Sequence, residues 1–134
     1  MHHPSNHQYT ELTHQIIGAY YRVYNTLGHG FLESVYRNAM VIKLHKEGLA
    51  VQTEEKIDVF YEDRLVGNFR ADIVEEGKII IELKAVESLH KKHEVQLVNY
   101  LRATNIEVGL RMNFGQEAKF IRRVLSNDRK KSKG

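Results

Sequence analysis

Two acids and a lysine stand out because they interrupt two neighbouring segments that are otherwise strongly apolar. Asp72 lies in the segment 70–74, and Glu82 and Lys84 lie in the segment 79–84, with a short Gly-containing turn between the two. Burying an ionised carboxylate costs on the order of several kcal/mol unless a cation or hydrogen bonds compensate it. A divalent metal ion and a phosphodiester would supply that compensation, so the pattern predicts a candidate metal site.

These three side chains can meet only if the turn between the two segments has the right length. Glu82 and Lys84 are two positions apart on one predicted strand, so they project from the same face. A three-residue loop at 75–77 would place Asp72 opposite Ile80, one diagonal step from Glu82. A loop of even length would send the two carboxylates to opposite faces unless a bulge corrected it. We therefore predict an odd number of loop residues or a bulge.

The residue types suit Mg²⁺ or Mn²⁺, which prefer oxygen ligands and keep several waters. Asp72, Glu82 and the backbone carbonyl of Leu83 are the candidate ligands. A metal ion bound there would polarise a phosphoryl oxygen and acidify a bound water. Lys84 could orient that water or stabilise the developing negative charge. Spacing alone leaves one alternative open, a surface cluster of acid–lysine pairs worth only about 0–1 kcal/mol.

Two further helical patterns carry polar residues that could border such a site. Gln96 and Tyr100 are four apart on one face of a predicted helix, with His93 three residues before Gln96. Glu33 and Tyr36 are three apart on another predicted helix. Each pattern has an alternative, because half-buried polar residues often flank a helix and an acid in a first turn is stabilised by the helix dipole.

Composition places the chain among ordinary globular proteins. It has 134 residues, of which 42% are hydrophobic and 28% charged, with a net charge of +3 and no cysteine. The sequence has no apolar run of about 18 residues and no secretory signal pattern, so we expect a cytoplasmic protein without a membrane span. The histidines form no zinc-binding set. We expect a flexible N-terminus at 1–9, one domain at 10–125 and a basic, disordered tail at 126–134.

Periodicity predicts the order ααβββαββ, which is an α/β fold with a mixed sheet flanked by helices. Short turns make the first three strands antiparallel, and the third helix is long enough for a parallel crossover to the fourth strand. The predicted helices span 10–27, 31–47 and 89–103, and the predicted strands span 51–61, 65–74, 78–86, 106–113 and 118–125.

Four motifs in this order resemble those of a known family. Residues 30–36 read Gly-x-x-Glu-x-x-Tyr, which is similar to the motif that names the GxxExxY proteins, a branch of the PD-(D/E)XK nuclease superfamily. Asp72 followed by Glu82-Leu83-Lys84 resembles the core signature of that superfamily. Gln96-x-x-x-Tyr100 resembles the additional motif of its RecB-type branch. The similarity covers about residues 10–125 and includes the segment 109–115.

The resemblance implies a restriction-endonuclease-like core and a set of roles. Glu33, Asp72 and Glu82 would be metal ligands and Lys84 the catalytic lysine. Further residues would support the site, namely Tyr36, His93, Gln96 and Tyr100. The sequence departs from the family pattern in two places. Arg111 occupies a strand position expected to be apolar, which would suit an edge strand, and the entry to the third helix carries Lys91 and Lys92, which could contact phosphates.

A Mg²⁺-dependent nuclease that hydrolyses phosphodiester bonds in DNA is therefore the leading hypothesis. One alternative is a non-catalytic module on the same fold that binds nucleic acid or a protein partner. Another is a structural or interaction protein whose charge cluster pairs internally and binds no metal. A domain this small cannot surround a duplex alone, so a homodimer is a further expectation.

Overall fold

The computed structural model describes residues 9–87 and 90–130, and it contains the predicted order of elements. The helices are α1 (Thr10–Leu27), α2 (Glu33–Lys46) and α3 (Lys91–Arg102), and the strands are β1 (Val51–Tyr61), β2 (Arg64–Glu75), β3 (Ile79–Lys84), β4 (Val108–Phe114) and β5 (Ala118–Val124). A short 3-10 turn, η1 (Asn127–Arg129), follows β5. No helix in the described ranges is both long and apolar enough to cross a membrane.

The five strands form one mixed sheet in the order β1-β2-β3-β4-β5. All neighbouring pairs are antiparallel except β3 and β4, which are parallel and are connected through α3. The predicted crossover is thus confirmed. Strand β3 lies at the centre of the sheet, and its apolar sequence reflects burial on both faces.

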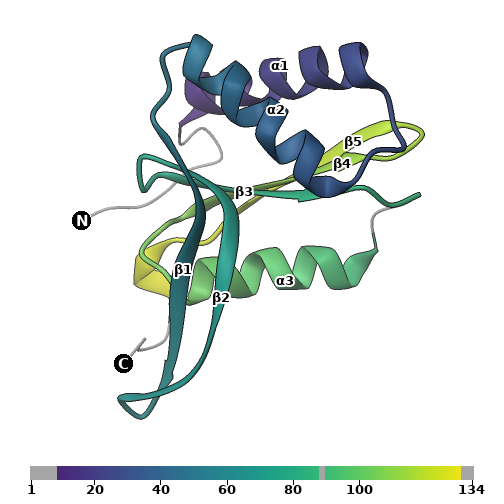
Figure 1. Cartoon of the computed structure of the whole chain (residues 1–134). Coiled ribbons are helices and arrows are strands. Elements are labelled where there is room, and N and C mark those ends of the chain that lie inside the picture. The colour runs from purple at the N-terminus through teal and green to yellow at the C-terminus, as the bar shows by residue number, and fades with distance from the viewer. Residues whose placement is uncertain (1–8, 88–89, 131–134) are drawn as a thin grey trace.

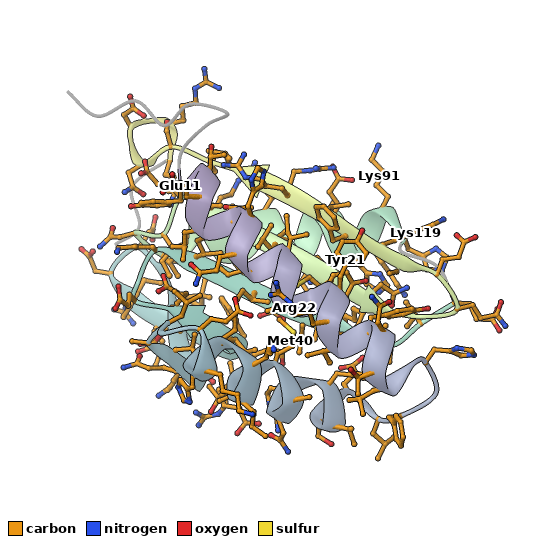
Figure 2. The ribbon with its side chains drawn as sticks, turned by 90° about the horizontal axis from the view of Figure 1, so that it is seen from above. Glu11, Tyr21, Arg22, Met40, Lys91 and Lys119 are labelled. Carbon is orange, nitrogen blue, oxygen red and sulfur yellow. The ribbon has the colours of Figure 1, made fainter. Side chains whose placement is uncertain are left out.

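Helices cover the two faces of the sheet unequally (Figure 1). Helices α1 and α2 lie on one face and α3 lies on the other. Along β3, Ile79, Ile81 and Leu83 belong to the core beneath α1 and α2, whereas Ile80 belongs to the core beneath α3. The alternation of β3 therefore points Glu82 toward the α3 side. In Figure 2, α1 and α2 are seen from above, with Arg22 on the outer side of α1.

The long strands β1 and β2 continue beyond the rest of the sheet as a two-stranded arm (Figure 1). A register shift between Val59 and Phe60 bends the pairing before the turn. The arm exposes several large apolar side chains near its tip, namely Phe60, Tyr61, Leu65 and Val66.

Residues 126–130, which the sequence analysis placed in the C-terminal tail, contact the loop between α3 and β4. Ser126 is buried, the Asn127 amide donates to Glu107 Oε2 at 2.7 Å, and Lys130 Nζ donates to the carbonyls of Thr104 and Ile106. The charge of Lys130 thus satisfies backbone carbonyls after α3, which composition alone did not reveal. Residues 131–134, like most of the predicted flexible stretch 1–9, lie outside the described residues.

Two hydrogen bonds of one side chain extend the contact between β3 and β4 beyond the end of β3. Buried Asn113 accepts from the Val86 amide at 3.0 Å and donates to the Val86 carbonyl at 2.8 Å, so one amide side chain satisfies both backbone groups. A Cβ atom added to Gly115 would overlap the Val86 carbonyl oxygen. The segment 113–115 therefore maintains the chain just after Lys84.

We predict that Gly115→Ala lowers the free energy of unfolding by about 1–3 kcal/mol, because the new methyl group must displace rigid backbone at Val86. Gly67→Ala is the matched control, since Gly67 has a negative φ and a methyl group added there would meet no atom within 4 Å. Chemical denaturation would compare the two variants. Equal stabilities would show that the Val86 carbonyl moves freely.

Candidate active site

The hairpin between β2 and β3 places Asp72 and Glu82 together. Pairing ends at Glu75 and Ile79, so residues 76–78 form a three-residue loop. The predicted odd loop length is confirmed, but the loop lies one residue further along the chain than expected. Continuing this register puts Asp72 directly opposite Glu82 rather than one diagonal step away.

The loop shifts because two consecutive residues adopt left-handed conformations. Glu76 has φ 44° and Gly77 has φ 67°, as the sequence predicted for Gly77 alone. The Lys78 amide then donates to the Glu75 carbonyl at 2.8 Å and closes the turn. Glu75 consequently joins the strand, and every pair in the hairpin moves by one residue on each side.

Backbone pairing between β2 and β3 extends only to Ile73 and Ile81. Beyond that point the two carboxylates replace backbone acceptors. The Asp72 amide donates to Glu82 Oε1 at 3.1 Å, and the Leu83 amide donates to Asp72 Oδ2 at 2.8 Å. Each acid therefore holds the backbone that carries the other.

Burial makes Glu82 unusual. Glu82 is only 6% exposed, and burial raises its pKa to about 8, with the neighbouring charge of Asp72 adding to the effect. At neutral pH Glu82 consequently retains its proton. A divalent cation bound to the two carboxylates would replace that proton, so the donor set fits a hard metal ion such as Mg²⁺ or Mn²⁺.

Arg111 supplies the positive charge next to this pair. It is fully buried on β4 and is the residue across from Glu82 in the parallel register. Its Nη2 atom donates to Gln96 Oε1 at 3.1 Å, whereas Nε and Nη1 have no hydrogen-bond partner among the described residues. Burial lowers the pKa of Arg111, and Glu82 opposes that effect.

The expectation that Arg111 lies at a sheet edge is wrong, because β4 runs between β3 and β5. Its buried guanidinium lies next to the buried carboxyl group of Glu82, and the charges of Glu82 and Asp72 favour its charged form. Sequence reasoning missed this role. The available signal was a single arginine inside the apolar segment 108–114 of a chain whose adjacent strand carries a buried acid.

Helix α3 brings its predicted polar residues to the same place. Gln96 Nε2 donates to the Tyr100 hydroxyl at 2.7 Å, which continues the chain of contacts from Arg111. The pKa of Tyr100 is raised by burial and by Glu82. The pKa of His93 is lowered by burial and by the charges of Arg111 and Lys84. These three residues of α3 therefore face the acidic pair and its lysine.

A cleft beside the acidic pair is lined by Lys84, Lys92, His93, Gln96, Asn99 and Tyr100. Lys91 and Lys92 are both exposed in the first turn of α3. Lys92 lines this cleft, whereas Lys91 points away from the body of the molecule (Figure 2). The two lysines, to which the sequence analysis gave the same role, therefore lie in different surroundings.

The segment 30–36 lies on the face of the sheet opposite α3. Tyr36 is fully buried, its hydroxyl donates to the Gly28 carbonyl at 2.6 Å, and the Phe31 amide donates to that hydroxyl at 3.1 Å. Its ring stacks on Phe114 with centroids 4.1 Å apart. Tyr36 therefore fixes the loop that precedes α2.

Glu33 is the first residue of α2 and is exposed. Its charge acts on the pKa of Arg111, although less than those of Glu82 and Asp72 do. No group of three or more His, Asp or Glu side chains in a metal-binding arrangement occurs within the described ranges. Asp72 and Glu82 are thus brought into contact, while Glu33 lies on another helix.

The pattern of the whole domain matches a known family. A family model described as the PD-(D/E)XK nuclease superfamily matches residues 10–124. A search of curated proteins found no match. Among solved structures, the crystal structure of SSO0001 is similar to 90% of this chain, with a TM-score of 0.56 and 19% sequence identity, and this chain spans 61% of the length of SSO0001. At that identity the likeness shows a shared fold.

The family match extends over all five strands and three helices and includes the acidic pair and its lysine. On this ground the chain belongs to the PD-(D/E)XK nuclease superfamily.

Proposed function

We propose that this protein is a Mg²⁺- or Mn²⁺-dependent nuclease that hydrolyses phosphodiester bonds in DNA. The observation that carries the proposal is the contact between Asp72 and Glu82 beside Lys84 on β3. A buried carboxyl group in contact with a second, half-buried acid is poorly explained as a surface salt-bridge cluster. Membership of the superfamily supports the same chemistry.

Asp72, Glu82 and the Leu83 carbonyl would hold the metal ion, with Glu33 reaching it from α2. When bound, a divalent ion polarises a phosphoryl oxygen and acidifies a coordinated water. The chain holds its two central ligands rigidly, because each carboxylate is bonded to the backbone amide of the opposite strand. Such positioning reduces the reorganisation needed when substrate binds.

Lys84 projects from β3 on the same face as Glu82 and lines the cleft. We assign it to orient the attacking water or to stabilise the negative charge that develops on the phosphate. Gln96 and Tyr100 support the site by holding Arg111 and each other. His93 and Lys92 border the cleft where a phosphate would enter, and Lys91 would contribute to long-range attraction of a polyanion.

We also propose that the chain belongs to the GxxExxY branch. In this interpretation the motif is a positioning device, because Tyr36 fixes the loop from Gly28 to Phe31 and thereby sets where α2, and with it Glu33, begins. DNA as substrate, a homodimer and a cytoplasmic location complete the proposal as predictions that solution experiments can test.

We predict that Glu82→Ala and Lys84→Ala each reduce cleavage of DNA in Mg²⁺ or Mn²⁺ by at least about a hundredfold. The first variant lacks a proposed metal ligand, and the second lacks the charge assigned to the attacking water or the phosphate. Gel assays with single-stranded and duplex DNA would measure the rates. Glu76→Ala and Lys78→Ala are matched controls in the hairpin at the other end of β3, and they should cleave as the unsubstituted protein does.

Two outcomes would contradict this proposal. Cleavage that persists in Glu82→Ala would place the active site elsewhere. Salt-dependent DNA binding that survives both substitutions, with no cleavage by the unsubstituted protein, would favour the non-catalytic module.

We predict one saturable Mn²⁺ site by titration calorimetry. Asp72→Asn and Glu82→Gln should abolish binding, because each removes a charged ligand. Glu33→Gln should weaken it about tenfold, as expected for a group at the margin of the site. Glu62→Gln, in the exposed turn of the arm, should leave the affinity unchanged. An unaltered affinity in Glu33→Gln would show that Glu33 is not a metal ligand and that its charge interacts only with the helix dipole.

The raised pKa of Glu82 predicts that ionisation of this carboxyl group destabilises the folded, metal-free protein. Glu82 has a pKa of about 8 when folded and about 4.5 when unfolded, so the folded protein binds the extra proton between these values. Its stability therefore falls as the pH rises through this window. Glu82→Gln, which keeps the acceptor for the Asp72 amide, should stabilise the protein by about 1 kcal/mol or more at pH ~8 in EDTA.

This gain from Glu82→Gln should shrink toward pH ~5, where the acid is protonated in the folded state. Thermal unfolding across this pH range would measure the difference. A gain that does not change with pH would show that Glu82 remains ionised throughout.

A further inference from the structure

A second cavity lies next to the cleft of the candidate active site. It has a volume of about 580 Å³, and we call it the α3 pocket. It is enclosed by the β1–β2 arm, the C-terminal half of α3 and residues near η1, and Figure 1 shows the arm passing beside α3. The lining residues that matter for its chemistry are Asp58, Phe60, Phe69, Tyr100, Arg102 and Arg129.

The α3 pocket adjoins the cleft. Asn99 and Tyr100 line both, and Lys84 lines only the cleft. A strand of nucleic acid that lies in the cleft and extends past Tyr100 would therefore come next to the pocket.

The walls of the pocket are aromatic. Phe69 stacks on Tyr100 with ring centroids 3.8 Å apart and planes 11° apart, so each ring fixes the position of the other. Phe60 extends this wall from the arm and is 45% exposed. Flat aromatic surfaces of this kind suit a nucleobase, whose faces stack on phenyl rings whatever its identity.

One acid lines the pocket but is already paired. Asp58 Oδ1 is inaccessible to solvent and forms an ion pair with Lys56 Nζ at 3.6 Å. We therefore assign Asp58 no contact with a ligand.

Positive charge is found at the opening of the pocket. Arg102 and Arg129 are exposed, and neither forms an ion pair within the described part of the chain. Lys130, by contrast, is occupied by the carbonyls of Thr104 and Ile106. The two guanidinium groups are therefore placed to bind phosphates on either side of a base.

We propose that the α3 pocket binds an unstacked nucleobase of a single-stranded nucleic acid, next to the phosphodiester in the active-site cleft. Phe60 and the Phe69–Tyr100 pair receive the base, and Arg102 and Arg129 bind the backbone. The proposal rests on the proposed function and names its substrate class. A base that is stacked within a duplex cannot enter the pocket, so single strands and frayed ends are preferred.

The test uses the full chain in EDTA, so that binding is observed without cleavage. The probe is a single-stranded oligodeoxynucleotide carrying 2-aminopurine, whose fluorescence falls when the base stacks on an aromatic ring. We expect quenching on binding, and little quenching when the same strand is annealed to its complement. Phe60→Ala and Arg129→Ala should each weaken binding about tenfold, and Phe60→Ala should also reduce the quenching.

Matched controls are available on the opposite face of the sheet. Tyr21→Ala removes a partly exposed aromatic residue of α1, and Arg22→Ala removes an exposed arginine of the same helix, which Figure 2 shows on its outer side. Both variants should bind and quench as the unsubstituted protein does. Unquenched probe, or Phe60→Ala and Arg129→Ala variants that bind like the controls, would overturn the proposal.

A second copy of the chain could instead fill the pocket with the apolar tip of its arm. Concentration-dependent self-association that is lost in Phe60→Ala and is not competed by the oligonucleotide would show this and would also overturn the proposal. The outcomes separate the two proposed functions. Cleavage without quenching would support the nuclease and contradict base binding in the α3 pocket. Quenching without cleavage of any substrate would support base binding and contradict the nuclease.

Discussion

The reciprocal hydrogen bonds between Asp72 and Glu82 are the constraint on which the candidate site depends. They occur where β2 and β3 stop pairing through their backbones, so each carboxylate occupies the place of a carbonyl from the other strand. A buried acid in contact with a second acid is stabilised by positive charge nearby, and Arg111 on the next strand provides it. Arg111 in turn donates a hydrogen bond to Gln96, and Gln96 donates one to Tyr100.

These polar contacts lie in a domain that otherwise follows simple rules. The face beneath α1 and α2 is a continuous apolar core, whereas the face beneath α3 turns polar where Glu82 and Lys84 replace aliphatic residues of β3. Such local violations of hydrophobic patterning are expected at functional sites, because stability is given up there for chemistry. More distant elements serve the site indirectly. Tyr36 fixes the start of α2, Asn113 maintains the chain after Lys84, and the β1–β2 arm forms one wall of the α3 pocket.

The sequence by itself determined the elements, their order and the candidate residues. Helical and strand periodicities are local, and they located all eight main elements within a few residues. The odd parity of the hairpin was also local, because strand alternation makes it a condition on one loop. Residue types then identified Asp72, Glu82 and Lys84, and the motif at 30–36 identified Glu33.

Only the tertiary structure decided the register, the burial and the partners. The loop at 76–78 moved by one residue because Glu76 adopts a left-handed conformation, which its residue type does not favour. Arg111 became the counter-charge of the acidic pair because the parallel pairing of β3 and β4 joins residues far apart in sequence. Lys130 contacts the domain because its ammonium group donates to two carbonyls that follow α3. Each of these outcomes depends on contacts between distant segments, and local sequence patterns carry no record of them.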